Sequence, residues 1–393
     1  MADKAKKSWL AFFIFYLAYM SLYLVRYNFS VASAVFENSG VLTKAQVGFI
    51  GSIFSLTYAI VKIPAGFMGD RLPTRWMIGG GLLLTAASNL LISRMMRFVP
   101  IAVLWGLNAC GQALIWGPVL RALSDLYGKE RGHHLQQYFI SCTSVGSIAG
   151  LLAATFLLER WPVTWCFVLA GSVPLVMAGA VFAITARVNA PAVQPPRQSP
   201  LQSAVTLWKT PDFRVKMFPA IANGLIKDNL SVWLVIYFMD CFGTDLKSMS
   251  GFVLFVPVML LIGKLIFPPL NRWLGSEARV SMLGFGAAVL ALLPLIAGTQ
   301  SPAVAMICLG VTAAMVSVVN THLLIPPASY AANGSIALCA SLMDVLVYGG
   351  AGIGSLFFGL MIARWGFGSM FLVWAVTSAA SLVILAGAER KKP

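Results

Sequence analysis

One arginine lies inside a long apolar stretch near the start of the chain. Arg26 is the only charged residue between Trp9 and Phe36. A cation in the middle of a membrane span costs about 2.5–3.5 kcal/mol on insertion scales, so such residues usually face a polar interior. Tyr19 and Tyr23 share its helix face through their i, i+4, i+7 spacing. Because a guanidinium binds phosphate or carboxylate through two parallel hydrogen bonds, this face predicts an anion site. The alternative is an Arg that reaches the membrane interface or pairs with a buried acid.

The composition places this face in a membrane. The chain has 393 residues, of which 59% are hydrophobic and 10% charged, a balance that soluble domains of this size do not show. Short loops between apolar segments carry most of the net charge of +15, which excludes nucleic-acid binding. The six cysteines lack metal or redox spacing, so neither a metal nor a cofactor is expected. No acid–base–nucleophile set points to an enzyme, and no Gly-x-x-x-x-Gly-Lys-Ser/Thr stretch points to ATP use.

Twelve apolar segments are long enough to cross the hydrocarbon core, which takes about 20 helical residues each. They cover residues 9–36, 46–68, 77–93, 99–124, 135–158, 164–186, 216–239, 250–271, 280–298, 302–325, 335–362 and 367–387. A stretch rich in proline and polar residues separates the sixth from the seventh and is typical of a linker. The predicted fold class is an all-α membrane protein with twelve transmembrane helices. They form two pseudo-symmetric six-helix bundles, 1–187 and 215–393, joined by a cytoplasmic linker, 188–214.

The two halves repeat one another in their charged and amide residues. Five pairs recur at an offset of 201 or 202 residues: Arg26 and Lys227, Asn28 and Asn229, Lys62 and Lys264, Arg71 and Arg272, and Arg121 and His322. Parallel repeats of this kind are related by an axis along the membrane normal and bind substrate between them near the midplane. The repeat therefore predicts that Lys227 lies at the depth of Arg26 in the other half.

The distribution of lysine and arginine predicts the orientation in the membrane. With the N-terminus inside, the cytoplasmic loops hold about three times as many of these residues as the outer loops. Both termini are therefore expected in the cytoplasm. A monomer in the inner (cytoplasmic) membrane of a bacterium is the expected form.

A charged motif follows the second apolar segment. It reads Gly66-Phe-Met-Gly-Asp70-Arg71-Leu-Pro-Thr-Arg75 and resembles the loop signature Gly-x-x-x-Asp-Arg-x-x-x-Arg of the major facilitator superfamily. Gly66 would allow two helices to approach closely. Asp70 could pair with Arg71, Arg75 or a neighbouring helix end as a gate latch, and a generic charged turn is the alternative. The second half keeps only an Asn-Arg pair at 271–272.

Within that superfamily, the first half resembles the organophosphate:phosphate antiporters, the family of the glycerol-3-phosphate and hexose-phosphate transporters. Four stretches carry the resemblance over most of residues 15–150: Tyr23-Leu-Val-Arg26 with Asn28-Phe29; Lys62-Ile-Pro-Ala-Gly66; the set Asn108, Gln112, Trp116, Pro118 and Arg121; and Lys129-Glu-Arg-Gly132. The resemblance implies that Arg26 grips phosphate. It also implies an antiporter that exchanges a phosphorylated metabolite for inorganic phosphate by alternating access.

The second half departs from the family pattern. Lys227, six residues before Trp233, stands where the family offers a second phosphate-binding Arg, so the charge is kept without the bidentate fork. Asp228 follows directly, and because neighbours on a helix point about 100° apart it need not neutralise Lys227. Residues 142–144 hold no His, unlike the glycerol-3-phosphate branch. A small organic anion is the expected substrate, and its identity stays open.

The expected substrate-binding residues are Arg26, Lys227, Lys62, Tyr19, Tyr23, Arg121, His322 and Trp116. Arg26 and Lys227 would grip the anion, one from each half. His322 could equally serve helix packing, and an aromatic such as Trp116 is more often a packing residue.

Four further residues carry ionisable side chains. Asp228 and Asp344 are candidate proton or ion-pair sites, because an acid inside a span must be neutralised or paired. His133 and His134 are expected to be solvated at a helix end.

Two other functions stay open beside anion exchange. One is a proton-coupled transporter of another small solute, with Asp228 or Asp344 as the proton site. The other is a non-transporting membrane sensor of a phosphorylated sugar. The expected partners are a small anionic substrate, inorganic phosphate or a proton as coupling ion, and the lipid bilayer.

Overall fold

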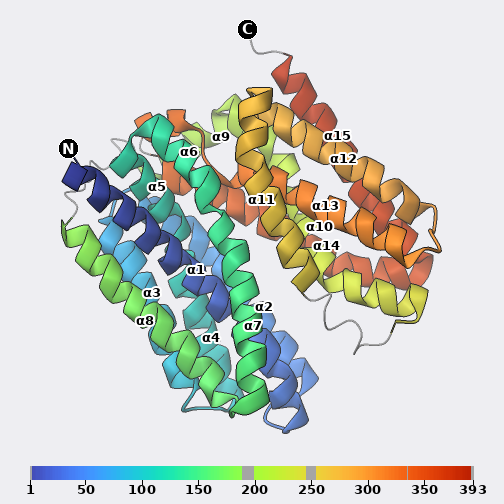
Figure 1. Ribbon diagram of the computed structural model, residues 1–393, viewed down its shortest axis with the longest axis horizontal. Helices are drawn as coiled ribbons and strands as arrows, with labels where there is room; N and C mark the ends of the chain where they lie inside the picture. The colour runs from blue at the N-terminus through green and yellow to red at the C-terminus, as the bar shows by residue number, and fades with distance from the viewer. Residues whose placement is uncertain (1, 188–198, 245–253, 334, 391–393) are drawn as a thin grey trace. The chain divides into compact units, whose positions relative to one another are not determined.

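The structure is a computed structural model that describes residues 2–187, 199–244, 254–333 and 335–390 (Figure 1). Within these ranges the chain forms helices and no strands. The chain divides into two compact units. Unit 1 comprises Met1–Pro200 and Pro326–Leu342, and unit 2 comprises Leu201–Ile325 and Met343–Pro393. Residues 326–342, which the sequence places in the second bundle, therefore cluster with the first unit.

The helices follow the chain in the order of the predicted segments. Those before the linker are α1 (Ala2–Asn38), α2 (Lys44–Gly69), α3 (Thr74–Ile92), α4 (Phe98–Ala113), α5 (Trp116–Tyr127), α6 (Lys129–Phe139), α7 (Ser141–Arg160) and α8 (Thr164–Arg187). Those after it are α9 (Pro200–Lys209), α10 (Pro211–Phe242), α11 (Phe255–Leu274), α12 (Glu277–Ile296), α13 (Pro302–Leu324), the 3₁₀ turn η2 (Ala328–Asn333), α14 (Ile336–Trp365) and α15 (Phe367–Glu389).

Eleven helical segments of the described residues are long and apolar enough to cross a membrane. They match eleven of the twelve predicted segments. The remaining one falls on α10, a helix of 32 residues that is long enough to span but carries several charges, which lower its hydropathy. The predicted all-α membrane fold is confirmed, and eleven of its twelve predicted spans qualify as membrane helices in the described part of the chain.

The same pairs of helices pack together within each unit. In unit 1, α3 packs against α8 and α4, α2 against α4, and α1 against α8. In unit 2 the corresponding pairs are α12 with α15 and α13, α11 with α13, and α10 with α15. The helices that carry Arg26 and Lys227, α1 and α10, thus have equivalent neighbours within their own units.

Local sequence signals explain where several helices begin and end. Thr43 caps α2 in a capping box with Gln46, because each side chain accepts a hydrogen bond from the other residue's backbone N–H. A proline interrupts the fourth span between α4 and α5. Pro118 has no N–H to offer the carbonyl of Leu114 four residues earlier, and its ring crowds that carbonyl. Leu114 is accordingly the C-cap of α4, whose last residue is Ala113.

The predicted linker is only partly described. Residues 188–198 lie outside the described residues, whereas α9 occupies Pro200–Lys209. The seventh predicted segment begins at residue 216, but α10 already begins at Pro211 with Thr210 as its N-cap. Proline is well suited to this first helical position, because its missing N–H would have no partner there.

Candidate functional site

Aromatic rings surround the guanidinium of Arg26 in unit 1. Its Cζ lies 4.6 Å from the ring centre of Tyr23, 4.8 Å from that of Tyr58 and 5.7 Å from that of Phe54. Its Nε donates a hydrogen bond to Oε1 of Gln112 at 2.9 Å. Cation–π contacts and this hydrogen bond hold a half-buried cation that would otherwise be costly in a membrane.

A second cation approaches the same tyrosine ring. Lys62 is fully buried, and its Nζ lies 4.9 Å from the ring centre of Tyr58. Both cations therefore contact the ring of Tyr58. Phe54, Tyr58 and Lys62 follow the i, i+4, i+8 spacing of one face of α2. Sequence reasoning missed Tyr58, although its spacing from Lys62 was a usable signal.

Tyr19 and Trp116 form the aromatic packing beside this cluster. Tyr19 is buried, with its ring 5.8 Å from Tyr23, 5.0 Å from Trp116 and 6.1 Å from Phe139. Trp116 is buried as well. The two predicted site residues thus lie one layer behind Tyr23 and support the ring that contacts Arg26. Two like charges in a poorly hydrated interior raise the potential for an anion, which is the chemistry that this arrangement favours.

In unit 2, Lys227, the predicted second cation, forms an ion pair with its neighbour in the sequence. Nζ of Lys227 donates to Oδ1 of Asp228. The long Lys side chain reaches across the angle between neighbouring helix positions, so the two residues pair despite pointing from different faces. Lys264 and Asp344 are both buried, at 6% exposure each.

His322 connects two helices of unit 2. Its Nδ1 shares a hydrogen bond of 2.7 Å with Oγ of Ser281, and its Nε2 lies 4.0 Å from Oε2 of Glu277. Ser281 and Glu277 belong to α12, whereas His322 belongs to α13. Of its two predicted roles, these contacts favour helix packing over a pocket role.

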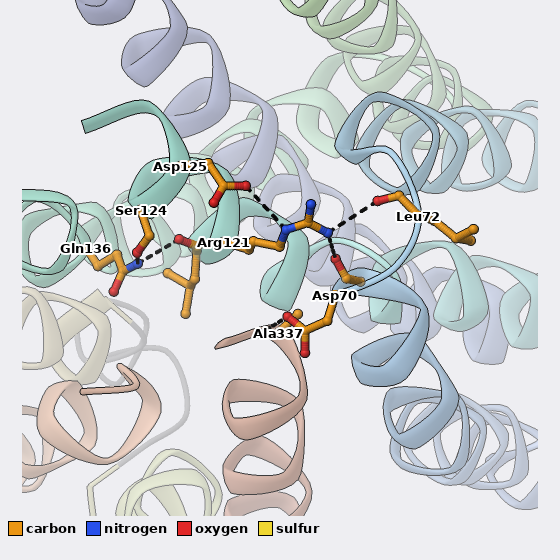
Figure 2. Close-up of polar contacts among 9 residues, drawn as sticks. Asp70, Leu72, Arg121, Ser124, Asp125, Gln136 and Ala337 are labelled. Atoms are coloured by element: carbon orange, nitrogen blue, oxygen red, sulfur yellow. Dashed lines mark hydrogen bonds and ion pairs between the residues drawn. The ribbon is translucent and has the colours of Figure 1, made fainter. Parts of the chain in front are cut away.

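The charged motif after α2 caps another helix. The carboxylate of Asp70 accepts a hydrogen bond from the backbone N–H of Ala337 at 2.9 Å (Figure 2). Its other oxygen accepts from the backbone N–H of Leu338, also at 2.9 Å. These are first-turn amides of α14, so Asp70 satisfies two donors at the positive end of a helix dipole. Of the partners predicted for Asp70, the structure has the neighbouring helix end. We call this contact the latch.

Arg121 belongs to the latch rather than to the Arg26 cluster. Its Nη1 donates to the carbonyl oxygens of Gly69 at 2.7 Å and Leu72 at 3.4 Å, and its Nε donates to Oδ2 of Asp125 at 3.3 Å (Figure 2). It thereby ties α5 to the end of α2 next to Asp70. The predicted substrate role of Arg121 is therefore less supported than a role in the latch.

The outer members of the motif are more exposed. Nη1 of Arg71 donates to the carbonyl of Phe67 at 3.1 Å, which caps the end of α2. The guanidinium of Arg75 lies 5.7 Å from the ring centre of Trp76.

His133 differs from expectation: it is half-buried, and its Nδ1 donates to the carbonyl of Pro326 at 3.0 Å. It thus holds the segment that leads into α14.

Burial controls the protonation of the latch. Asp70 is only 3% exposed, and this burial raises its pKa to about 7, although the two backbone hydrogen bonds and the nearby Arg121 and Arg71 lower it. When Asp70 is exposed to water its pKa returns to about 4. Protonation therefore favours the latched state, and this advantage is lost as the pH rises through 7.

Asp70→Asn is expected to slow transport about tenfold at pH 8 while leaving substrate affinity nearly unchanged. The amide cannot ionise, so the latch no longer responds to pH, and it accepts from one α14 amide instead of two. The changed balance between the latched and unlatched states slows exchange. Exchange rates in proteoliposomes between pH 6 and 8 should rise with pH for the wild type and stay flat for the variant. Asp212→Asn, in an exposed acid paired with Lys216, is the control. A normal rate and pH profile for Asp70→Asn would remove the latch from the transport cycle.

Gly66 allows α14 to approach α2. A Cβ at this position would lie 2.8 Å from Cβ of Ser341 and 3.1 Å from Cα of Leu338. Gly66→Ala is therefore expected to destabilise the protein by about 1–3 kcal/mol through overpacking, measured as a lower melting temperature in detergent. Gly51→Ala is the matched control on the same helix, because a Cβ there meets nothing within 4 Å. Equal melting temperatures for the two variants would contradict the close packing.

Comparison of the sequence with known proteins identifies the family of this chain and several relatives. The family model described as Major Facilitator Superfamily matches residues 9–342. A probable hexose phosphate transport protein of Chlamydia trachomatis is 35% identical over 123 residues, 31% of this chain and 27% of that protein. The membrane sensor protein UhpC of Salmonella typhimurium is 32% identical over 118 residues, 30% of this chain and 27% of that protein. These matches thus span little more than a quarter of each relative.

The fold also matches a solved transporter structure. The major facilitator superfamily transporter FucP, in its outward conformation, superposes with a TM-score of 0.78 over 98% of this chain and 100% of that chain. The sequence identity of 16% limits this likeness to the fold.

Proposed function

We propose that this chain, which belongs to the major facilitator superfamily, exchanges a small phosphorylated metabolite for inorganic phosphate by alternating access. The observation that carries the proposal is the pair of cations at one aromatic ring: Cζ of Arg26 lies 4.8 Å and Nζ of Lys62 4.9 Å from the ring centre of Tyr58. The name of one relative, a probable hexose phosphate transport protein, supports a phosphorylated substrate.

The substrate class follows from the charge of these groups. A phosphate monoester carries close to two negative charges at neutral pH, since the second pKa of a phosphate ester is near 6. Arg26 would bind two phosphate oxygens in a bidentate way, and Lys62 would supply a second positive charge. The ring of Tyr58 contacts both cations and would hold them near the same place. Lys227 is the proposed cation from the second half.

The latch gives the proposed cycle a conformational element. Asp70 holds the first turn of α14 within unit 1, and α14 continues into unit 2 from Met343. Release of this turn would free a helix shared by both units. Substrate would shift the equilibrium only through contacts that differ between the latched and unlatched states.

The proposal includes the orientation of the chain in the membrane, the membrane that holds it and its oligomeric state. The excess of Lys and Arg in alternate loops supports cytoplasmic termini. A bacterial inner membrane is proposed because the relatives named above are bacterial. A monomer is proposed, since each chain would carry both halves of the site.

Two measurements on purified protein test the proposal. Inorganic phosphate and hexose or glycerol phosphates should raise the melting temperature, and simple carboxylates of equal charge should raise it less. In proteoliposomes loaded with inorganic phosphate, external phosphate ester should release labelled phosphate one for one. Stabilisation by carboxylates alone would overturn the substrate class. Exchange that requires a pH gradient would instead support the proton-coupled alternative, with Asp228 or Asp344 as the proton site.

A sensor is the second candidate function. The identity of 32% to membrane sensor protein UhpC is the observation that favours it. A sensor would bind phosphate esters in the thermal assay as a transporter does. It would, however, release no labelled phosphate from loaded proteoliposomes, which separates the two functions.

A further inference from the structure

A row of buried amides leads from Arg26 into the interior of unit 1. Gln112 accepts from Nε of Arg26, and its own Nε2 donates to Oδ1 of Asn108 at 3.2 Å. The same Oδ1 accepts from Nδ2 of Asn89 at 3.4 Å. Oδ1 of Asn89 in turn accepts from Nδ2 of Asn28 at 3.2 Å. The four amides come from α1, α3 and α4, and none is more than 2% exposed.

The direction of the hydrogen bonds in this row is fixed at one end. Nδ2 of Asn89 also donates to the backbone carbonyl of Thr85 at 2.9 Å. Turning this amide over would place its oxygen against a carbonyl oxygen, so Asn89 must present Nδ2 to Asn108. Asn108 must then present Oδ1 to both neighbours, and Gln112 must present Nε2 to Asn108. The only end of Gln112 left for Arg26 is Oε1, the acceptor that a guanidinium needs.

The row is not optimised for stability. Oδ1 of Asn28, Nδ2 of Asn108 and Oγ1 of Thr85 are buried without a hydrogen-bond partner in the described part of the chain. Burying unpartnered polar atoms is unfavourable, and apolar side chains of the same volume would avoid it. A partly satisfied polar row at this place therefore suggests a role other than packing.

We propose that Asn89 and Asn108 are positioning residues for anion binding, which act on Arg26 through Gln112. The inference rests on the proposed function, in which Arg26 binds the substrate. Because Gln112 engages Nε, an anion bound in a bidentate way must use the two Nη groups. The amide row thereby fixes both the plane of the guanidinium and the direction from which the phosphate approaches. A binding group needs such support to keep its geometry within a fraction of an ångström.

Two alanine variants and a matched control test this role. Asn108→Ala and Asn89→Ala are expected to raise the dissociation constants of inorganic phosphate and of a hexose phosphate about tenfold, as loss of an outer-shell partner does at metal sites. Asn320→Ala is the control, because Asn320 is 3% exposed and donates to Oδ1 of Asn223 at 3.0 Å in unit 2. All three should lower the melting temperature, but only the first two should weaken anion binding. Unchanged dissociation constants for Asn108→Ala and Asn89→Ala would overturn the proposal.

A second readout needs no substrate. A dicarbonyl reagent specific for guanidinium, followed by mass spectrometry of the peptide around residue 26, reports how firmly Arg26 is held. Faster labelling of Arg26 in Asn108→Ala than in wild type or Asn320→Ala is expected, and equal rates would contradict the positioning role. Asn89→Ser, which keeps a small polar group, replaces Asn108→Ala if that variant does not fold. If wild type binds no phosphate ester, the proposed function fails while the labelling still tests the positioning of Arg26.

Discussion

Arg26→Lys weakens the binding of inorganic phosphate and phosphate esters by about a hundredfold, although the positive charge is kept. A hydrogen bond to a charged group is worth about 1.5–3 kcal/mol, and each 1.4 kcal/mol is about tenfold in affinity. An ammonium lacks the planar fork that binds two phosphate oxygens while a third nitrogen donates to Gln112. Anion-induced stabilisation, measured across a phosphate titration, gives the change in dissociation constant.

Arg75→Lys is the matched control for this substitution. Arg75 is exposed in the first turn of α3 and contacts the ring of Trp76, so the same chemical change there should leave phosphate affinity unaltered. A surviving affinity in Arg26→Lys, within about threefold of wild type, would exclude a bidentate role for Arg26. Loss of affinity in both variants would point to a general effect of replacing arginine on folding.

The helices could be predicted from the sequence because a membrane span requires a continuous apolar run, which the local composition reveals. Apolar runs of sufficient length and the polar break after residue 187 place most helix ends within a few residues. Helix α10 was also predicted, because its apolar run is long enough to span although its charges lower its hydropathy. Helix α10 begins at Pro211, earlier than predicted, because the proline that was assigned to the linker also fits the first turn of a helix.

The site was predictable only where one residue carries the signal alone. Arg26 stands out as a single charge in an apolar run. Gln112 is 86 residues away from Arg26, and Asp70 is 267 residues away from its partner Ala337. Contacts across such separations depend on how helices pack, which spacing along one helix does not reveal. The same limit explains why Tyr58 was missed: its importance comes from Arg26 on another helix.

Helix geometry alone also misjudged one neighbouring pair. The angle of about 100° between successive residues indicates that Lys227 and Asp228 point apart. That rule describes where Cβ atoms point, whereas the flexible chain of Lys carries Nζ back to the carboxylate of Asp228. The local net charge at these two positions is therefore near zero, which bears on how Lys227 can serve an anion site.

Lys227→Ala is expected to weaken phosphate-ester binding by about a hundredfold or more. The substitution removes a cation and leaves the carboxylate of Asp228, its partner in the structure, uncompensated. The local charge thus changes from about zero to minus one, which repels an anion as well as failing to bind it. Lys227→Arg keeps the charge and adds a fork, so it should bind phosphate at least as tightly as wild type.

The double variant Lys227→Ala, Asp228→Ala separates the two causes. It restores local neutrality without a cation, so it recovers binding if repulsion by Asp228 is the cause and stays defective if Lys227 itself contacts the anion. We expect it to stay defective, with thermal stabilisation by phosphate esters as the measurement. Lys216→Ala is the control, since it breaks another ion pair of α10, with Asp212 at 3.3 Å, and should leave anion binding intact. Full stabilisation of Lys227→Ala by the ester that stabilises wild type would remove Lys227 from the site and leave Arg26 and Lys62 as its cations.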